Sequence, residues 1–541
     1  MLVIYHANIH TFNPGQPHAS AIAIYKDKIL AVGDDYSILS NFGQQVNQID
    51  PVLLLDGGGR TIIPGLTDAH IHLEQFALGL SKLNCETPTI EECKTGVADK
   101  ANKTPQGEWI LGHGWNQNNW PEGYGTAQSL DQVAPNHPVY LTAKSLHAAW
   151  VNSLALQAAQ ISLNTPNPPG GEIKRESQGN PTGILFESAM QLVERAIPTP
   201  SVEALVQSLR DAQPTLWKMG LTGVHDFDGA RCFSALQYLH ENNELKLRVI
   251  KGIPLIEMDH AIHLGLRSGF GDDWLRIGNI KIFSDGALGP RTAAMLQPYE
   301  NEPDNDGMLL IDSEELFETG IAAIENGFSL AVHAIGDRAN HEVLIALNKL
   351  KEYEISLQKR TNDKNRPKLR HRIEHVQIIH PDDSRQLAAT GAIASMQPIH
   401  ATSDMHMADR FWGKRSATSY AWRLLKDLGA SLAFGSDAPV ESPNPFLGLH
   451  AAVTRRRTDG SPGEEGWYPD QRLTVMEALE GYTKGAAYAA GMEDYLGMLA
   501  PGYLGDLLVL EDDPFSHQPD SLWNIRPVAT LVGGEWVYRD F

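Results

Sequence analysis

The sequence predicts an α/β protein: a (β/α)8 TIM barrel with an insertion after its first strand, and a small β-sandwich domain formed by both chain termini. From Ile63 onward, apolar and β-branched runs alternate with helical segments, which is typical of a parallel α/β architecture. Both ends of the chain consist instead of short strand-like runs. A chain of 541 residues has room for one large barrel and a satellite domain.

The terminal β-domain is predicted from short apolar runs near both ends of the chain. They are residues 21–24, 28–32, 506–510, 528–532 and 535–538. The first two flank a polar turn, as in a β-hairpin. Because neither end of the chain could bury a core by itself, we expect residues 1–60 and 481–541 to form one domain.

Eight apolar runs predict the barrel over residues 61–480. The first ends in His70 and His72, and the others are residues 221–226, 245–253, 277–283, 329–333, 371–375, 392–396 and 431–437. The interval between the first two runs is far too long for one helix, so about residues 73–200 are expected to form an inserted subdomain. Such insertions usually shape substrate access; the alternative is that this one mediates dimerisation or packing.

Two histidines at the end of the first run, His70 and His72, suggest the chemistry. Alternate side chains of a strand point to the same face, so both imidazoles and the carboxylate of Asp68 would project together. Such a set suits a divalent metal ion. The alternative is that one histidine is buried and the other is solvated.

Further polar residues follow the later strands of the barrel. Active sites of such barrels form at the carboxyl ends of the strands, and the polar residues there are His70, His72, His225, Lys281, His333, His375 and Asp437. Buried polar groups cost free energy unless they are partnered, and one metal ion partners several of them. This convergence predicts a metal site at the barrel mouth.

The order of these residues resembles the ligand order of the amidohydrolase superfamily: two histidines on strand one, lysine on four, histidine on five and six, and aspartate on eight. The local sequences resemble the family 3 branch, which includes N-substituted formamide deformylase. They are residues 64–72, 281–289, 333–340, 372–375 and 435–439. The resemblance covers essentially the whole chain.

The resemblance implies a site for one or two divalent metal ions, Zn²⁺. The ligands would be His70, His72, Lys281, His333, His375 and Asp437. An unmodified ammonium group is a donor and cannot ligate a metal ion. In this superfamily the strand-four lysine is often carboxylated by CO₂, which gives a carbamate that bridges two metals. The alternative for Lys281 is an ion pair with Asp285 or Asp437.

The implied function is hydrolysis of a non-peptide C–N (amide) bond, in an N-acyl or N-formyl amine. Bound Zn²⁺ lowers the pKa of its water to about 7, and the resulting metal-bound hydroxide would attack the carbonyl. Asp437 would act as the catalytic acid/base, taking the proton of the water and delivering it to the leaving nitrogen. The alternatives are hydrolysis of a cyclic amide, carbamate or ester on the same scaffold, and a catalytically inactive barrel used as a binding module.

Candidates for the substrate-binding wall are polar or aromatic residues near the barrel mouth or in the insertion. They are His147, His225, Arg291, Gln397, His400 and Trp115. Glu374 precedes His375 on its strand and is expected to face away from the site. Two departures from the family pattern, Asn116 and Leu146, lie in the insertion and concern the substrate.

Composition and charge exclude several classes of partner. The net charge of −22 argues against nucleic acid, because there is no basic field to neutralise phosphates. Three cysteines, none in a Cys-x-x-Cys pair, are too few for a disulfide framework. The N-terminal sequence lacks a secretory pattern, and no apolar run is long enough for a bilayer. We therefore expect a cytoplasmic enzyme that acts on a small-molecule amide and has no membrane partner. We also expect that it could form a homodimer.

Overall fold

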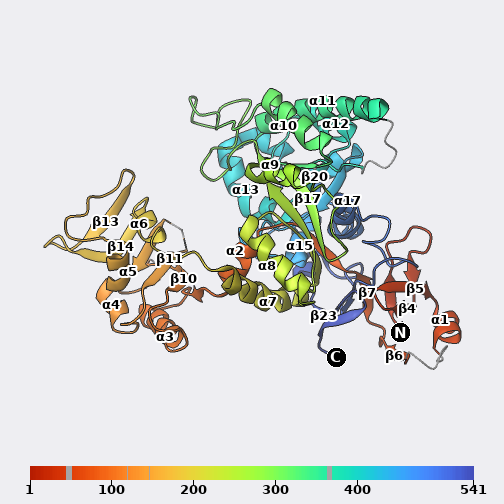
Figure 1. Cartoon of the computed structure of the whole chain (residues 1–541), viewed down its shortest axis with the longest axis horizontal. Coiled ribbons are helices and arrows are strands. Elements are labelled where there is room, and N and C mark those ends of the chain that lie inside the picture. The colour runs from red at the N-terminus through yellow and green to blue at the C-terminus, as the bar shows by residue number, and fades with distance from the viewer. Residues whose placement is uncertain (44–50, 118–119, 145–146, 362–367) are drawn as a thin grey trace. The chain divides into compact units, whose positions relative to one another are not determined.

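The computed structural model describes residues 1–43, 51–117, 120–144, 147–361 and 368–541, so Leu146 lies outside the described residues. The chain forms two compact units (Figure 1). The first comprises Met1–Phe76 and Leu209–Phe541, and the second comprises Ala77–Ser208. The first unit contains the barrel and the terminal sheets.

Eight parallel strands form the barrel and confirm the predicted fold class. In spatial and sequence order they are β8 (Leu66–Ile71), β15 (Leu221–Asp226), β16 (Arg248–Pro254), β17 (Leu275–Phe283), β18 (Leu330–Ala334), β19 (Arg372–His375), β20 (Ile393–Met396) and β21 (Ser431–Phe434). These strands are buried almost throughout, which is why they read as continuous apolar runs in the sequence.

The barrel closes between its first and last strands through the residues that follow β21. The amide of Asp437 donates to the carbonyl of His70 at 2.7 Å, and the amide of His72 donates to Ala438 at 2.8 Å. Gly435 permits this approach, because a Cβ atom there would lie 2.5 Å from the amide nitrogen of His70. The closure therefore brings the ends of β8 and β21 together.

Helices surround the barrel strands (Figure 1). They include α8 (Ala230–Glu241), α10 (Ser313–Glu325), α11 (Asp337–Thr361), α12 (Pro381–Thr390), α13 (Pro398–Trp412), α14 (Trp422–Asp427), α15 (Pro445–Thr454) and α17 (Ala486–Ala490). In α11, Val343, Leu347 and Leu350 are buried at helical spacing, so one apolar stripe faces the core.

The two chain termini form one β-sandwich, as the sequence predicts. One sheet has the order β5 (Lys28–Gly33), β4 (Ala21–Tyr25), β1 (Leu2–Tyr5), β6 (Leu53–Asp56); the other has the order β24 (Glu535–Arg539), β23 (Pro527–Val532), β22 (Leu507–Leu510), β7 (Thr61–Pro64), β2 (Asn8–His10), β3 (His18–Ala19). In the second sheet β7 pairs with β22, so residues from both ends share one ladder. Ile4, Ile24, Leu507 and Leu531 from the two sheets pack in one buried cluster.

A buried ion pair fixes the sandwich to the barrel. Arg248 of β16 donates to the Asp506 carboxylate from Nε at 2.5 Å and from Nη2 at 2.8 Å. The amide of Gly533 donates to the same carboxylate at 2.8 Å. Both charged side chains are almost fully buried, so each depends on the other for compensation.

The second unit is built on a six-stranded sheet. Its order is β13 (Gly171–Arg175), β14 (Pro181–Glu187), β12 (Ala148–Val151), β11 (Val139–Ala143), β10 (Ile110–Trp115), β9 (Leu83–Asn84). Trp115, Trp120 and Trp150 are buried in its core. Among the described residues of the whole chain, no helix combines the length and the apolar character needed to cross a membrane.

Candidate metal centre

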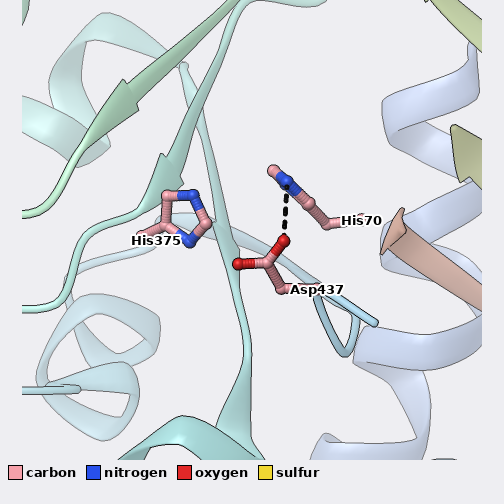
Figure 2. A group of neighbouring side chains, drawn as sticks. All are labelled: His70, His375 and Asp437. Atoms are coloured by element: carbon pink, nitrogen blue, oxygen red, sulfur yellow. Dashed lines mark ion pairs between the residues drawn. The ribbon is translucent and has the colours of Figure 1, made fainter. Parts of the chain in front are cut away.

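Three of the predicted ligands meet at the carboxyl end of the barrel. Ligand atoms of His70, His375 and Asp437 all lie within 4.8 Å of one another. Figure 2 shows the two rings on either side of the Asp437 carboxylate, and His70 Nε2 lies 3.6 Å from Asp437 Oδ1. The three residues come from β8, from β19 and from the segment after β21, so barrel closure assembles the group.

His72 and His333 extend this group. His72 follows β8, and its Nε2 lies 3.5 Å from Asp437 Oδ1. The ring of His333, from β18, has its centroid 4.6 Å from that of His375, and the His70 and His375 centroids are 4.9 Å apart. His72 therefore lies beside the Asp437 carboxylate and His333 lies beside His375, next to the group of three.

Acceptors behind three of the rings orient them. The Nδ1 atoms of His70, His72 and His375 lie 2.6 Å from Glu374 Oε2, 3.1 Å from Asp228 Oδ1 and 2.8 Å from Gln397 Oε1, respectively. Because these oxygens accept hydrogen bonds, each Nδ1 carries a proton, which leaves the lone pair of a neutral ring on Nε2. This is the tautomer that a metal-ligating histidine needs.

His333 is oriented in the opposite way. Its Nε2 donates to the carbonyl of Gly286 at 2.9 Å, so its lone pair is on Nδ1. The nearby Asp285 accepts from the amides of Ile335, Gly336 and Ala294 at 2.8–3.0 Å, and it fixes the loops after β17 and β18. His333 therefore offers a lone pair from a ring that two loops hold in place.

The prediction that Glu374 faces away from the site is wrong. Its carboxylate hydrogen bonds to His70 and forms a buried ion pair with Arg372. Strict alternation along β19 fails because His375 has a left-handed backbone with φ of 74°, which redirects its side chain. Glu374 lies behind a candidate ligand, and His375 lies beside it.

Asp68 is used by the barrel closure. Its carboxylate accepts from the amides of His70 and Ser436 at 3.0 Å, and from the Ser436 hydroxyl at 2.5 Å. Burial raises the pKa of Asp68 to about 7. These contacts tie the turn after β21 to β8 and account for the residue without a metal ion.

Lys281 is buried at the end of β17 with its ammonium group unpaired. Its Nζ has no hydrogen-bond partner within the described part of the chain, so the alternative of an ion pair with Asp285 or Asp437 is not found there. Its Nζ lies over the rings of Phe283 and Phe227, 4.8 and 5.0 Å from their centroids. Burial lowers the pKa of Lys281 to about 8.

Burial also sets the charge state of the candidate ligands. It lowers the pKa of His70 and His375 well below the usual value and that of His333 to about 3, so these rings are neutral. Burial raises the pKa of Asp437 to about 6, although His72 and Lys281 act in the opposite direction. These three neutral imidazoles and the Asp437 carboxylate form a nitrogen and oxygen donor set that fits Zn²⁺ or a similar ion.

Gln397, His400 and His225 lie close to this centre. Gln397 holds His375, and the His400 ring lies parallel to that of His375 at 6.3 Å. His225 is buried inside the barrel, where its Nδ1 lies 2.8 Å from Arg372 Nη1. This contact with Arg372 inside the barrel indicates that His225 has a structural role.

The other predicted substrate-binding residues have partners of their own. Arg291 forms an ion pair with Glu302 at 2.5 Å. In the second unit, Trp115 is 1% exposed and donates to the carbonyl of Leu141, whereas His147 is exposed and lies 3.0 Å from Glu187. The structure accounts for the position of Trp115 by packing, and substrate contact by Arg291 or His147 stays a prediction.

Sequence reasoning missed Asp228 and Gln377, which contact His72 and His400. Asp228 lies two residues beyond the end of β15, so its place after a barrel strand was the available signal. Gln377 likewise lies two residues beyond β19. Each contacts another side chain of the site, so the sequence order of the predicted ligands did not mark it.

Several known proteins match most of this chain. The model of the amidohydrolase family matches residues 54–538. The putative amidohydrolase YtcJ of Bacillus subtilis is 34% identical over 89% of this chain and 89% of its own length. N-substituted formamide deformylase of Arthrobacter pascens is 27% identical over 99% of this chain and 98% of its own. The crystal structure of an uncharacterized metal-dependent hydrolase from Pyrococcus furiosus, 26% identical, covers 95% of this chain and 100% of its own with a TM-score of 0.77.

Proposed function

The chain belongs to the amidohydrolase family, a metal-dependent hydrolase family, and we propose that it hydrolyses a non-peptide carbon–nitrogen bond in a small N-acyl or N-formyl amine. The observation that carries the proposal is the convergence of His70, His375 and Asp437 at the barrel mouth. Active sites of (β/α)8 barrels form at this end of the strands.

Four histidines would hold the metal ion. His70, His72 and His375 would bind through Nε2, because Nδ1 of each ring faces an acceptor, and His333 would bind through Nδ1. A bound divalent ion supplies an activated water and polarises a carbonyl group. We propose Zn²⁺ because nitrogen and carboxylate donors suit it.

Asp437 would move the proton. Its carboxylate lies 3.6 and 3.5 Å from the Nε2 atoms of His70 and His72, so it lies beside the candidate ligands. One carboxylate can accept a proton from the attacking water and then donate it to the nitrogen that leaves. The left-handed backbone of Asp437, with φ of 60°, is the kind of strain that functional sites hold.

Lys281 would be carboxylated. A buried amine without a hydrogen-bond partner among the described residues is an unsatisfied group. Attack of its nitrogen on the carbon of CO₂ forms an N–C bond, releases one proton and leaves a carbamate anion. The carbamate oxygens can ligate metal ions, whereas the ammonium group cannot.

The substrate class rests on a likeness. One relative is an N-substituted formamide deformylase. It is 27% identical to this chain, and the match covers 98% of its length. An N-formyl or N-acyl amine is therefore our first substrate, and another amide, a carbamate or an ester is the alternative on the same scaffold. The cytoplasmic location and the homodimer stay predictions.

Metal content and turnover test the proposal together. Protein purified without chelator should contain at least about one equivalent of Zn²⁺ or a similar ion per chain, and it should hydrolyse members of a panel of N-formyl and N-acetyl amines. His70→Ala combined with His72→Ala should lose the metal and the turnover. The control is His260→Ala with His263→Ala, two exposed histidines of α9 (Met258–His263). Unchanged metal content in the first double variant would contradict the assignment.

A further inference from the structure

Two hydrogen-bond donors beside His375 lack an acceptor. The Nε2 atoms of Gln397 and His400 are buried, and neither has a hydrogen-bond partner in the described ranges of the chain. Gln397 is 1% exposed and His400 is 5% exposed. Buried polar groups are normally satisfied, so two orphans next to a candidate ligand indicate a missing acceptor.

Both residues belong to the first turn of α13. Gln397 precedes the helix, His400 is its third residue, and the amide of His400 donates to the carbonyl of Gln397 at 3.0 Å. The amino end of a helix carries a partial positive charge, which favours an acceptor that holds or gains negative charge. The two side chains thus present their donors from one rigid turn.

The orientation of Gln397 is fixed by His375. Gln397 Oε1 accepts from His375 Nδ1 at 2.8 Å, so the amide nitrogen is the free end. A side-chain amide nitrogen can only donate. Gln397 therefore offers an N–H donor directly beside His375, a candidate metal ligand.

The orientation of His400 is fixed by Gln377. Gln377 Nε2 lies 3.4 Å from His400 Nδ1, and because the amide nitrogen donates, Nδ1 accepts and the ring proton is on Nε2. Burial lowers the pKa of His400 to about 4, so the ring is neutral. The ring is parallel to that of His375 within 8°, and the two ring centroids are 6.3 Å apart, so His400 lies beside a candidate ligand.

We propose that Gln397 and His400 bind the carbonyl oxygen of the amide that is cleaved, with His400 Nε2–H donating to that oxygen as it gains charge. When the water oxygen bonds to the carbonyl carbon, the C=O π pair moves onto this oxygen and the water proton goes to Asp437. The pair returns when the C–N bond breaks and the nitrogen takes that proton. This role rests on the proposed function and adds a donor that no ligand residue supplies.

His400→Phe tests the donor, because phenylalanine keeps a planar ring and removes the N–H. The probes are 4-nitroformanilide and 4-nitroacetanilide, which release coloured 4-nitroaniline. We expect kcat/KM to fall about 10²-fold, mainly through kcat, as on removal of other donors of this kind, with unchanged metal content. His400→Gln should recover part of the loss because its amide nitrogen lies near the position of Nε2. His406→Phe, at an exposed site on the same helix, is the control.

Calorimetric titration of acetate, a product carboxylate, separates failure of this subsite from failure of the proposed function. Acetate should bind the metal-loaded protein and bind H400F about tenfold more weakly, whatever the turnover. If the unaltered protein hydrolyses neither anilide, anilide hydrolysis is contradicted and acetate still decides the subsite. Equal kcat/KM in H400F, or no difference in acetate binding, overturns the subsite. Should H400F not fold, His400→Asn, whose amide is too short, is compared with His400→Gln.

Discussion

Glu374→Gln should weaken metal binding without touching a candidate ligand. In the native site the Glu374 carboxylate accepts from His70 Nδ1 at 2.6 Å and pairs with Arg372, and all three side chains are almost fully buried. The neutral amide has one oxygen and one NH₂ group, so the NH₂ group must face either His70 Nδ1 or Arg372 Nε, both of which meet a carboxylate oxygen in the native site. His70 therefore loses a charged partner or is turned from its orientation.

The magnitude follows from the kind of contact that is lost. Loss of a hydrogen-bond partner of a ligating histidine typically costs about 10–100-fold in metal affinity, which is about 1.4–2.8 kcal/mol at about 1.4 kcal/mol per tenfold. The contact is short, charged and buried, so we expect the upper half of this range. In the variant, Arg372 keeps its hydrogen bonds to the carbonyl of Ala69 at 2.6 Å and to the Ser395 hydroxyl at 2.5 Å. We expect the fold to survive with a free energy of unfolding lowered by less than the about 3–5 kcal/mol of a wholly broken buried pair.

The assay is competition for Zn²⁺ between the protein and a chelator, with thermal unfolding of the metal-free protein measured in parallel. Asp506→Asn is the matched control, because it also removes a carboxylate from a buried arginine pair but faces no histidine. Both variants should lower the unfolding temperature, but only E374Q should raise the Kd for Zn²⁺. An unchanged Kd in E374Q would refute a role for His70 as an oriented ligand.

Three further predictions concern the proton, the closure and the terminal domain. Asp437→Asn should keep most of the metal and lower turnover at least about 10²-fold, measured on the best amide found; near-normal turnover would leave Asp437 a structural role. Gly435→Ala should cost about 1–3 kcal/mol of unfolding free energy and weaken metal binding, because the new Cβ would press on the His70 amide; denaturation and metal titration of the variant check both. Deletion of residues 1–58 should make the protein insoluble, because it exposes the free edge of β7 and the apolar face of β22; a soluble, folded truncation in a sedimentation assay would contradict this.

The barrel and the candidate ligands could be predicted because both depend on local order. Parallel strands covered on both faces appear as apolar runs, and a polar residue at the end of such a run lies at the barrel mouth. Glu374 could not be placed in this way, since alternation assumes an extended backbone and His375 departs from it. Asp228 and Gln377 are recognised only through the side chains that they touch, so their roles depend on tertiary contacts.

The orienting groups explain why the site needs the whole barrel. The acceptors behind His70, His72 and His375 come from β19, from the segment after β15 and from the segment after β20, whereas two of the rings themselves come from the end of β8. A slip of one strand by one residue would turn an acceptor away from its ring, and the wrong nitrogen could then carry the proton. The tautomers are thus set by strand register, and closure of β8 against β21 places Asp437 against rings that are already oriented.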